Sequence, residues 1–477
     1  MALTLRGLAG TMHRRHLAPG SSLLDRWRAQ VKSRKGGSSD MATAHARYDL
    51  RADGLTRRRF LQTSAGGLAG LAGIVALQVP PSLAQQREVS MLSWAHFVPQ
   101  ADQKLHEIGA RFEKATKIKI RFDHLQEAQM AAKLAAEVQT GTGHDLLMLR
   151  MHLPLLHATN LADMSDVVET LTKQYGPLYE FCEEAAYYKD HWVAMPAYHG
   201  AFPGSYNKKY FDEVGEKPPD TWEDLVRAGK KMKAKGHPVG IPISQTNDAV
   251  STLGPIMWAF GAKAVDKDGK TVTINSEETS EAIEYVKRLY NEAMEPEVLS
   301  WDDASNNRFL ISGKGSWIAN PQSHYLTAKT RNMPITQDIY FQLMPAGPKG
   351  RHTTTFIRSM GIWKFSKNIE PAKEFIKFFL NQEQYNDYVN AAQAFDAPVF
   401  KSMEDHPVWK IDPKYEPIKE SGRYGHLYGW PAPGDERSQQ VTNNFIIPIM
   451  FAKAIGGTSN KEAMAWAEAE IKRIYST

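Results

Sequence analysis

The feature that most constrains the fold is an alternation of predicted buried strands and amphipathic helices between residues 89 and 149. Apolar or period-two runs predict strands at 89–94, 118–122 and 144–149, and apolar spacing of three to four residues predicts helices at 100–116 and 126–139. In the first helix this spacing places Leu105, Ile108 and Phe112 on one face. The order β-α-β-α-β predicts an α/β fold with a parallel sheet and a ligand crevice beyond the carboxyl ends of its strands.

The rest of the chain continues the alternation less regularly. Asp220 or Thr221 is expected to cap a helix that runs to Lys235. Further helices are expected at 276–293, 371–380, 441–455 and 461–475, and further strands at 316–319, 339–344 and 358–365. A length of 477 residues and a hydrophobic content of 42% allow more than one core.

Residues 1–84 have the layout of a leader that ends in a signal peptide. Arg57-Arg58-Arg59-Phe60-Leu61 precedes a Gly- and Ala-rich apolar run, which is typical of a twin-arginine export signal. The apolar run is shorter than the ~20 residues that span a bilayer, so export is favoured over anchoring. Cleavage is expected near Ala84, and no cysteine lies there to carry a lipid. The product is therefore expected to be soluble in the periplasm.

The distribution of charge argues against a nucleic-acid partner. The formal net charge is +5, but residues 1–84 hold 13 of the 58 Lys and Arg residues and only 4 of the 53 Asp and Glu residues. The mature part is therefore slightly acidic, and the basic balance belongs to the leader. Cys182 is the only cysteine, which excludes an intrachain disulfide.

Several short motifs recur in a fixed order along residues 88–477. The first strand ends in Trp94, and the other motifs are Gly-Thr-Gly-His-Asp at 141–145, Tyr-Asn-Lys at 206–208, Pro-Asp-Thr-Trp-Glu-Asp-Leu at 219–225 and Phe-Leu-Ile-Ser-Gly-Lys at 309–314. In this order and spacing the chain resembles the family 1 extracellular solute-binding proteins, the group that contains maltose-binding protein.

The resemblance implies a two-lobed periplasmic-binding-protein fold in which each lobe is a mainly parallel sheet flanked by helices. Lobe I would comprise 87–201 and 315–360, and lobe II would comprise 204–312 and 364–477, with hinges at 198–206 and 359–364. The implied function is capture of a small polar solute, a sugar or polyol, by lobe closure, and its delivery to the permease of an ABC importer. No cofactor, metal or catalytic residue is implied, and a monomer is expected.

A site for sugars needs aromatic faces for stacking and polar groups that both donate and accept hydrogen bonds. Residues of these types cluster where predicted strands end and where the chain crosses between lobes, and His96 in particular is expected to face the crevice. The predicted ligand-binding residues are Trp94, His96, Phe97, Arg150, His152, Tyr198, His199, Asn320, Gln322 and Trp430.

One segment departs from the family pattern and leaves the ligand open. Sugar binders often carry a tryptophan after Gly-Pro at a strand end, whereas this chain reads Ala-Asn-Pro-Gln-Ser at 319–323. The stacking platform would then lie at Trp258, Trp301 or Trp430. Arginines such as Arg150 and Arg358 can also bind an anionic group, so a glycerol phosphate is an alternative ligand.

Two other classes of function are weighed against binding. A secreted carbohydrate-active enzyme would use a pair of carboxylates, and Asp302 and Asp303 are one candidate pair. Residues next to each other in sequence point in different directions, however, and a glycosidase needs two carboxyls that face each other. The histidines at 144, 152 and 157 have no standard metal-ligand spacing. A binding protein is favoured over both an enzyme and a metal-capture protein.

Overall fold

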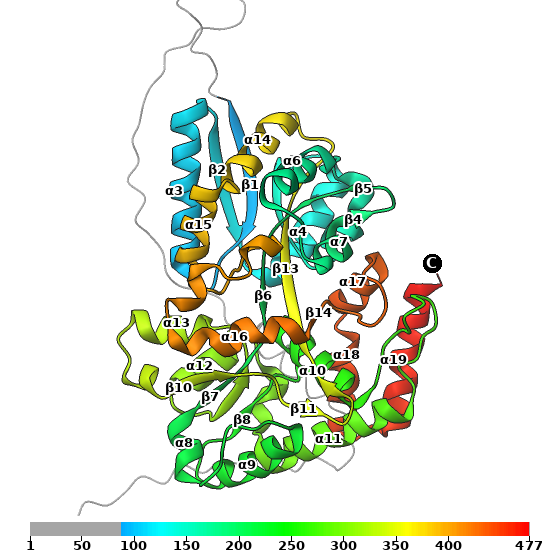
Figure 1. The fold of residues 1–477 in the computed structure, drawn as a ribbon. Coiled ribbons are helices and arrows are strands. Elements are labelled where there is room, and N and C mark those ends of the chain that lie inside the picture. Colours follow the sequence, from blue (N-terminus) through cyan, green and yellow to red (C-terminus); the bar gives the residue numbers. More distant parts are fainter. Residues whose placement is uncertain (1–86, 477) are drawn as a thin grey trace, which may run out of the picture. The chain divides into compact units, whose positions relative to one another are not determined.

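The computed structural model describes residues 87–476, so the predicted leader and signal peptide at 1–84 lie outside the described residues. Within that range the strands form two larger sheets (Figure 1) and two small hairpins, and the buried apolar side chains form two hydrophobic cores. None of the helices in this range is both long enough and apolar enough to cross a membrane.

The first sheet contains the strands that the alternating pattern predicts. Its members are β1 (Glu88–Trp94), β2 (Lys119–Leu125), β3 (Leu146–Arg150), β6 (Met195–Ala201), β13 (Thr353–Ile362) and β14 (Gly425–His426). The order is β14-β13-β3-β1-β2, and β6 also pairs with β13. Strand β1 is parallel to both β2 and β3, whereas β13 is antiparallel to β3 and β6. The β-α-β-α-β prediction is confirmed.

The two helices that connect the first three strands of this sheet begin, end and bury their apolar faces as their sequences predict. Helix α3 (Pro99–Thr116) begins with a proline. Proline lacks a backbone N–H, but it costs no hydrogen bond here because N–H groups in the first turn have no acceptor within the helix. The helix buries the face that contains Leu105 and Phe112. Helix α4 (Glu127–Thr140) ends at Gly141, whose φ of 62° is a left-handed conformation that glycine adopts without steric cost.

The second sheet is mixed. It contains β7 (Gly204–Asn207), β8 (Val239–Gly240), β9 (Trp317–Ala319) and β10 (Ile339–Gln342) in the order β10-β7-β9-β8. Only β8 and β9 are parallel, because β7 is antiparallel to both β9 and β10. The prediction of a mainly parallel sheet in each lobe is therefore wrong for this sheet. The chain between β8 and β9 contains helices, as the crossover between two parallel neighbours requires.

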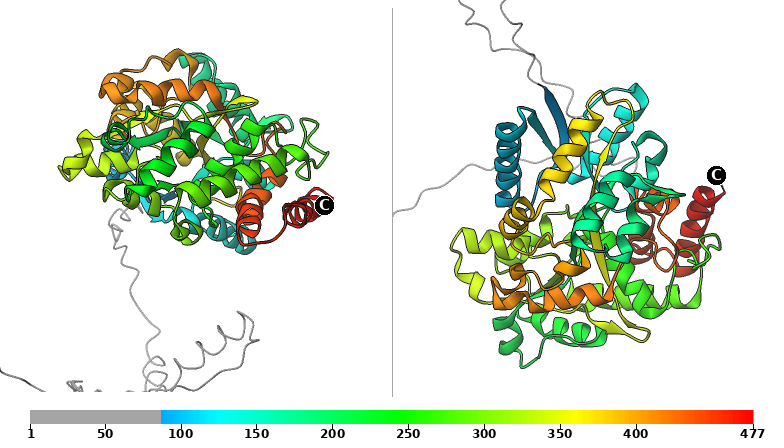
Figure 2. Two further views of the ribbon diagram at one scale, coloured as in Figure 1. Left: turned by 90° about the horizontal axis from the view of Figure 1, so that it is seen from below. Right: turned by 45° about the horizontal axis from the view of Figure 1, so that its top comes forward.

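Helices surround the second sheet, and all of them supply the second core except those at 305–311 and 323–330, whose apolar side chains belong to the first core. They are α8 (Lys208–Glu213), α9 (Trp222–Ala234), α10 (Asn247–Phe260), α11 (Glu277–Ala293), α12 (Ser305–Ile311), α13 (Ser323–Thr330), α18 (Ile446–Ile455) and α19 (Asn460–Tyr475). Thr221 caps α9, because its side chain accepts a hydrogen bond from the backbone of Asp224. Helix α19, coloured dark red, lies against α18 at the edge of this group (Figure 2).

The remaining elements pack mostly around the first sheet. The helices are α5 (Leu153–Leu156), α6 (Ser165–Tyr175), α7 (Glu180–Ala186), α14 (Ile369–Phe379), α15 (Gln382–Ala391), α16 (Glu416–Ser421) and α17 (Glu436–Asn443). Two small hairpins pair β4 (Tyr187–Tyr188) with β5 (His191–Trp192) and β11 (Ala346–Gly347) with β12 (Gly350–Arg351).

Sheet pairing differs from the predicted lobe segments in two places. Strand β9 belongs to the second sheet, although 315–360 was expected in lobe I. Helices α14 and α15 pack on α3 and supply the first core, although 364–477 was expected in lobe II. The predicted hinge at 359–364 overlaps β13, which pairs with β3 up to Ile362. The chain leaves the first sheet after β6, returns to it only at β13 and stays with it through β14, so the segment boundaries after residue 204 fall later in the sequence than predicted.

Candidate ligand-binding cleft

A cavity of about 400 Å³, its opening to solvent included, lies between the carboxyl ends of strands from both sheets. Trp94 and Arg150 are the last residues of β1 and β3, Glu127 opens the helix after β2, and Asn320 follows β9. This is the place where ligands bind in α/β sheets. The complete lining is Trp94, Phe97, Glu127, Arg150, Phe202, Asn247, Asp248, Asp303, Asn320, Pro321, Phe356, Arg358 and Phe395.

One wall of the cavity is a stack of an indole, a guanidinium and a carboxylate. The guanidinium carbon of Arg358 lies 3.8 Å from the centroid of the Trp94 ring, and Nη2 of Arg358 donates to Oε2 of Glu127 at 2.6 Å. Nε1 of Trp94 donates to the hydroxyl of Tyr198 at 3.2 Å. Burial opposes the ionisation of Glu127, but the guanidiniums of Arg358 and Arg150 outweigh it and lower the pKa of this carboxyl.

Arg150, at the end of a strand of the first sheet, is connected by hydrogen bonds to helix α10 beside the second sheet. Its Nη1 donates to Oδ1 of Asn247 at 3.0 Å, and its Nη2 donates to the hydroxyl of Tyr428 at 2.6 Å. That hydroxyl also lies 2.9 Å from Oγ of Ser251 in α10. Arg150 is buried and its nearest partners are neutral, so its side chain is held by directional hydrogen bonds.

The opposite wall carries two neighbouring carboxyls. Oδ1 of Asp303 accepts from the backbone N–H of Asp248 at 3.1 Å, and its Oδ2 accepts from Nδ2 of Asn247 at 3.2 Å. Nδ2 of Asn306 donates to Asp248 at 2.7 Å. Burial, and then the Asp303 carboxylate, raise the pKa of Asp248 well above its ordinary value, and burial also raises the pKa of Asp303. Burial therefore disfavours the ionised form of both carboxyls.

Four of the predicted ligand-binding residues line this cavity, namely Trp94, Phe97, Arg150 and Asn320. Tyr198 lies directly behind them, since its hydroxyl accepts the hydrogen bond of Trp94. Asn320 bonds Asn307 through its amide. These side chains were predicted because the carboxyl ends of parallel strands lie on one edge of a sheet, and this arrangement is what brings them together here.

Three other predicted residues are buried in hydrogen-bonded positions outside the lining. His96 is only 7% exposed, and its Nε2 lies 2.9 Å from Asp396, so the expectation that it faces the crevice is wrong. Its Nδ1 accepts from the backbone of Val98, which fixes the ring. Gln322 donates to the carbonyl of Gln393. His152 contacts Ser438, and burial lowers its pKa to about 4.

The last two predicted residues line other cavities. His199 faces a separate cavity beside α16, and burial lowers its pKa to about 4. Trp430 lines an apolar cavity near α18 and α19, where its ring stacks on His426 at 4.1 Å and contacts Trp258 at 5.8 Å. The expected alternative stacking platforms Trp258 and Trp430 therefore form one cluster, apart from Trp94.

Reasoning from the sequence missed several residues of the cavity as ligand contacts: Glu127, Phe202, Asn247, Asp248, Asp303, Phe356 and Phe395. Glu127 carried a usable signal, because it lies just after the end of β2 and Trp94 lies at the end of the neighbouring strand β1. Asp303 and Asp302 do point in different directions, since Asp303 lines the cavity whereas Asp302 pairs with exposed Arg308. Within residues 87–476, no three His, Cys, Asp or Glu side chains are grouped to hold a metal ion.

Comparisons with solved structures give the fold a context. A maltose-bound protein of T. maritima, MalE3, superimposes with a TM-score of 0.72 at 20% identity and covers 81% of this chain and 99% of its own. A ribitol-bound solute-binding protein of Agrobacterium radiobacter K84 gives a TM-score of 0.70 at 18% identity and covers 81% and 98%. These likenesses confirm the two-lobed α/β fold of a periplasmic binding protein.

Sequence comparisons identify the family. The arabinooligosaccharide-binding protein of Bacillus subtilis (strain 168) is 26% identical over 199 residues, which amount to 40% of this chain and 45% of that protein. The chain therefore matches less than half the length of this relative. A family model described as bacterial extracellular solute-binding protein matches residues 107–417, which is more than half of the chain. The protein belongs to the bacterial extracellular solute-binding proteins.

Proposed function

We propose that this protein is the substrate-binding component of an ABC importer and that it captures a sugar or polyol in the cavity beside Trp94. The observation that carries the proposal is the lining itself, in which aromatic faces alternate with carboxyl, amide and guanidinium groups at the carboxyl ends of strands. Relatives support it, since those described above bind maltose, ribitol or arabinooligosaccharides.

The balance of charge in the cavity favours a neutral ligand over an anion. Arg150 and Arg358 contribute two positive charges, and the three carboxyls of Glu127, Asp248 and Asp303 line the same cavity. An anionic solute such as a glycerol phosphate would add a buried charge without a counterpart. Hydroxyl groups can accept from the guanidiniums and donate to the carboxylates without that cost.

The placement of the lining suggests the mechanism. Trp94 and Arg150 come from the first sheet, and Asn320 and Asp303 come from segments around the second. A solute between them contacts both lobes only when the lobes are closed, so it stabilises the closed state in proportion to that extra contact. The permease would recognise the closed state, and export to the periplasm after cleavage near Ala84 would place the protein beside it as a monomer.

Ligand screening of the purified protein tests this proposal. Thermal shift against mono- and oligosaccharides, polyols and glycerol phosphates is expected to show stabilisation by a neutral sugar or polyol, of about 2.7 kcal/mol at 100 times the dissociation constant. If only the glycerol phosphates stabilise the protein, the ligand is an anion and not a neutral sugar or polyol. Stabilisation by none of these solutes would contradict the ligand class.

Adjacent aspartates provide a matched pair of variants for locating the site. Asp303→Asn is expected to weaken binding of the identified sugar about tenfold, because an amide replaces a charged acceptor. Asp302→Asn changes the exposed neighbour and is expected to leave the affinity unchanged. Trp430→Ala distinguishes between the two aromatic clusters as candidate sites. If only this variant loses sugar binding, the sugar binds in the cavity near α18 and not in the cavity beside Trp94.

A further inference from the structure

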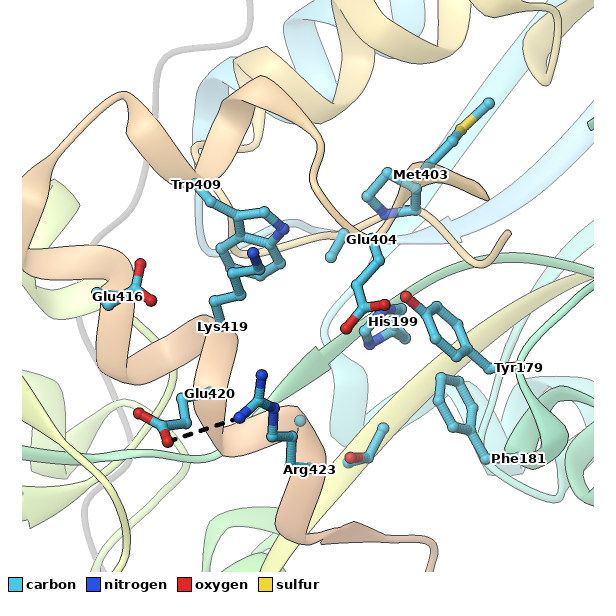
Figure 3. A pocket seen from close by; sticks show the side chains of 14 residues that line it. Tyr179, Phe181, His199, Met403, Glu404, Trp409, Glu416, Lys419, Glu420 and Arg423 are labelled. Atoms are coloured by element: carbon cyan, nitrogen blue, oxygen red, sulfur yellow. Dashed lines mark ion pairs between the residues drawn. The ribbon is translucent and has the colours of Figure 1, made fainter. Parts of the chain in front are cut away.

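The two strands that border the ligand cleft have a second cavity on their other face. Successive side chains of a strand point to opposite faces. In β6, Tyr198 contacts Trp94 of the cleft, whereas His199 faces the second cavity. In β13, Phe356 lines the cleft, whereas Thr355 lines the second cavity. This cavity comprises about 990 Å³ of space, its opening to solvent included, and residues between Met403 and Arg423 line its other side (Figure 3).

Aromatic rings form two walls of this second cavity. The rings of Tyr179 and Phe181, at the start of α7, stack nearly parallel with centroids 5.3 Å apart. His199 packs edge-on against Tyr179 at 5.4 Å and lies 5.1 Å from Phe181. Trp409 stands on the facing wall, across the cavity from Tyr179 (Figure 3). Since burial lowers the pKa of His199 to about 4, this ring is neutral at physiological pH and adds no positive charge.

The charged groups of this cavity leave an excess of carboxylate. Lys419 is paired with Asp405, and Arg423 lies 4.0 Å from Glu420. The carboxylates of Glu404 and Glu416 form no ion pair with any residue in the described range. Glu404 projects toward Tyr179 and His199 (Figure 3). Burial is the main cause that raises the pKa of Tyr179 to about 12, and the charge of Glu404 adds to it.

We propose that this second cavity is a binding site for an organic cation, either a protonated amine or a quaternary ammonium group. Aromatic faces attract such a cation through their quadrupole, and an unpaired carboxylate adds a direct electrostatic attraction. The rings of Tyr179, Phe181 and Trp409 and the carboxylate of Glu404 provide both attractions within one cavity. The site is separate from the sugar cleft, and its test does not depend on the identity of the sugar.

Choline and its neutral isostere 3,3-dimethyl-1-butanol test the proposal directly. Titration calorimetry and thermal shift on the purified protein are expected to show saturable binding of choline and little binding of the isostere, because only choline carries the charge. Sodium chloride at the same ionic strength controls for salt. Equal binding of both compounds would show a merely apolar pocket, and absence of choline binding would overturn the cation site.

Substitutions at the cavity then locate the bound cation. Glu404→Gln is expected to weaken choline binding about tenfold, because it removes a charged partner. Glu183→Gln, at an exposed carboxylate of α7 outside the cavity, is the matched control and should bind choline as the parent does. Phe181→Leu keeps the apolar volume but removes a ring face, and it should also weaken binding. Unchanged affinity in both Glu404→Gln and Phe181→Leu would place choline elsewhere.

Discussion

At the scale of single residues, the cleft depends on buried charges that are paired. Arg358 is 3% exposed, and Glu127 is its carboxylate partner. Removing one partner of a buried ion pair leaves the other charge without compensation, which costs more than the pair contributes. The sequence suggested an anion-binding role for Arg358, but it did not reveal the carboxylate partner, because Glu127 lies 231 residues away in the chain.

Glu127→Gln is therefore expected to lower the free energy of unfolding by about 3 kcal/mol, since it leaves the guanidinium of Arg358 buried beside a neutral amide. Denaturant unfolding at pH 7 measures the change. Glu374→Gln, at an exposed carboxylate of α14, is the control and should unfold like the parent. A loss no larger than that of the control would mean that Glu127 is not the group that compensates Arg358.

A second buried pair predicts a pH dependence. Glu137 accepts hydrogen bonds from His144 at 2.5 Å and from Trp363 at 2.9 Å. Burial opposes its ionisation, but these bonds lower its pKa to about 2. Burial also opposes the charge on His144, but its bonds to Glu137 and Asp123 raise the pKa of the ring above 6.5. Glu137 thus adds stability above about pH 4.5, and His144 adds stability below about pH 6.5.

The difference in unfolding free energy between the parent and Glu137→Gln is accordingly expected to be largest between about pH 4.5 and 6.5. It should shrink as the pH falls toward 2, where Glu137 takes up a proton, and as the pH rises through the folded pKa of His144. Urea unfolding of both proteins across this range measures it. A difference that does not vary with pH would argue against an ionic contact.

At the scale of secondary structure elements, the contact between β6 and β13 shapes both cavities. Gly200 lies in β6, where an added Cβ would come within 2.3 Å of the Phe356 ring and 2.5 Å of the Phe395 carbonyl oxygen. Both phenylalanines line the cleft. The glycine is therefore required by close approach of a neighbouring ring and carbonyl, a requirement that the strand pattern of the sequence does not reveal.

Gly200→Ala is expected to destabilise the protein by about 1–3 kcal/mol and to weaken sugar binding, because Phe356 must move into the cleft or the strands must separate. Thermal unfolding and ligand titration measure the two effects. Gly422→Ala is a fitting control, since Gly422 has a helical φ of −55° and open space around it. The explanation fails if both variants behave alike.

At the scale of the whole molecule, the proposed function requires that two groups of elements approach each other around one solute. Arg150 already joins them through Asn247 and Tyr428, and Asp303 faces it across the same cavity. A sugar that fills the cavity would add contacts to both sides at once. The closed state would then gain population according to the difference in ligand affinity between the two states.

Small-angle scattering is expected to show a smaller radius of gyration when the identified sugar is present at saturation, because bound ligand selects the closed state. Asp303→Asn at the same sugar concentration should compact less, in line with its weaker binding. Asp302→Asn should compact like the parent. If the sugar binds tightly and the radius does not change, binding takes place without closure.

The sequence by itself determined the parts of the fold that depend on local chemistry. Alternating apolar runs and helical spacing defined β1, α3, β2, α4 and β3, and a hydroxyl before Trp222 marked the start of α9. Trp94 and Arg150 could be predicted as cleft residues because the carboxyl ends of parallel strands lie on one edge of a sheet. Each of these inferences needs only the residues within one or two neighbouring elements.

Only the tertiary structure decided which distant segments share a sheet and a site. It placed β9 in the second sheet and α14 and α15 on the first, and it brought Glu127 to Arg358. It also turned His96 inward to Asp396 and separated Trp430 from Trp94. Such contacts join residues hundreds of positions apart, so burial and charge compensation across the whole fold select them, whereas local propensity carries no information about them.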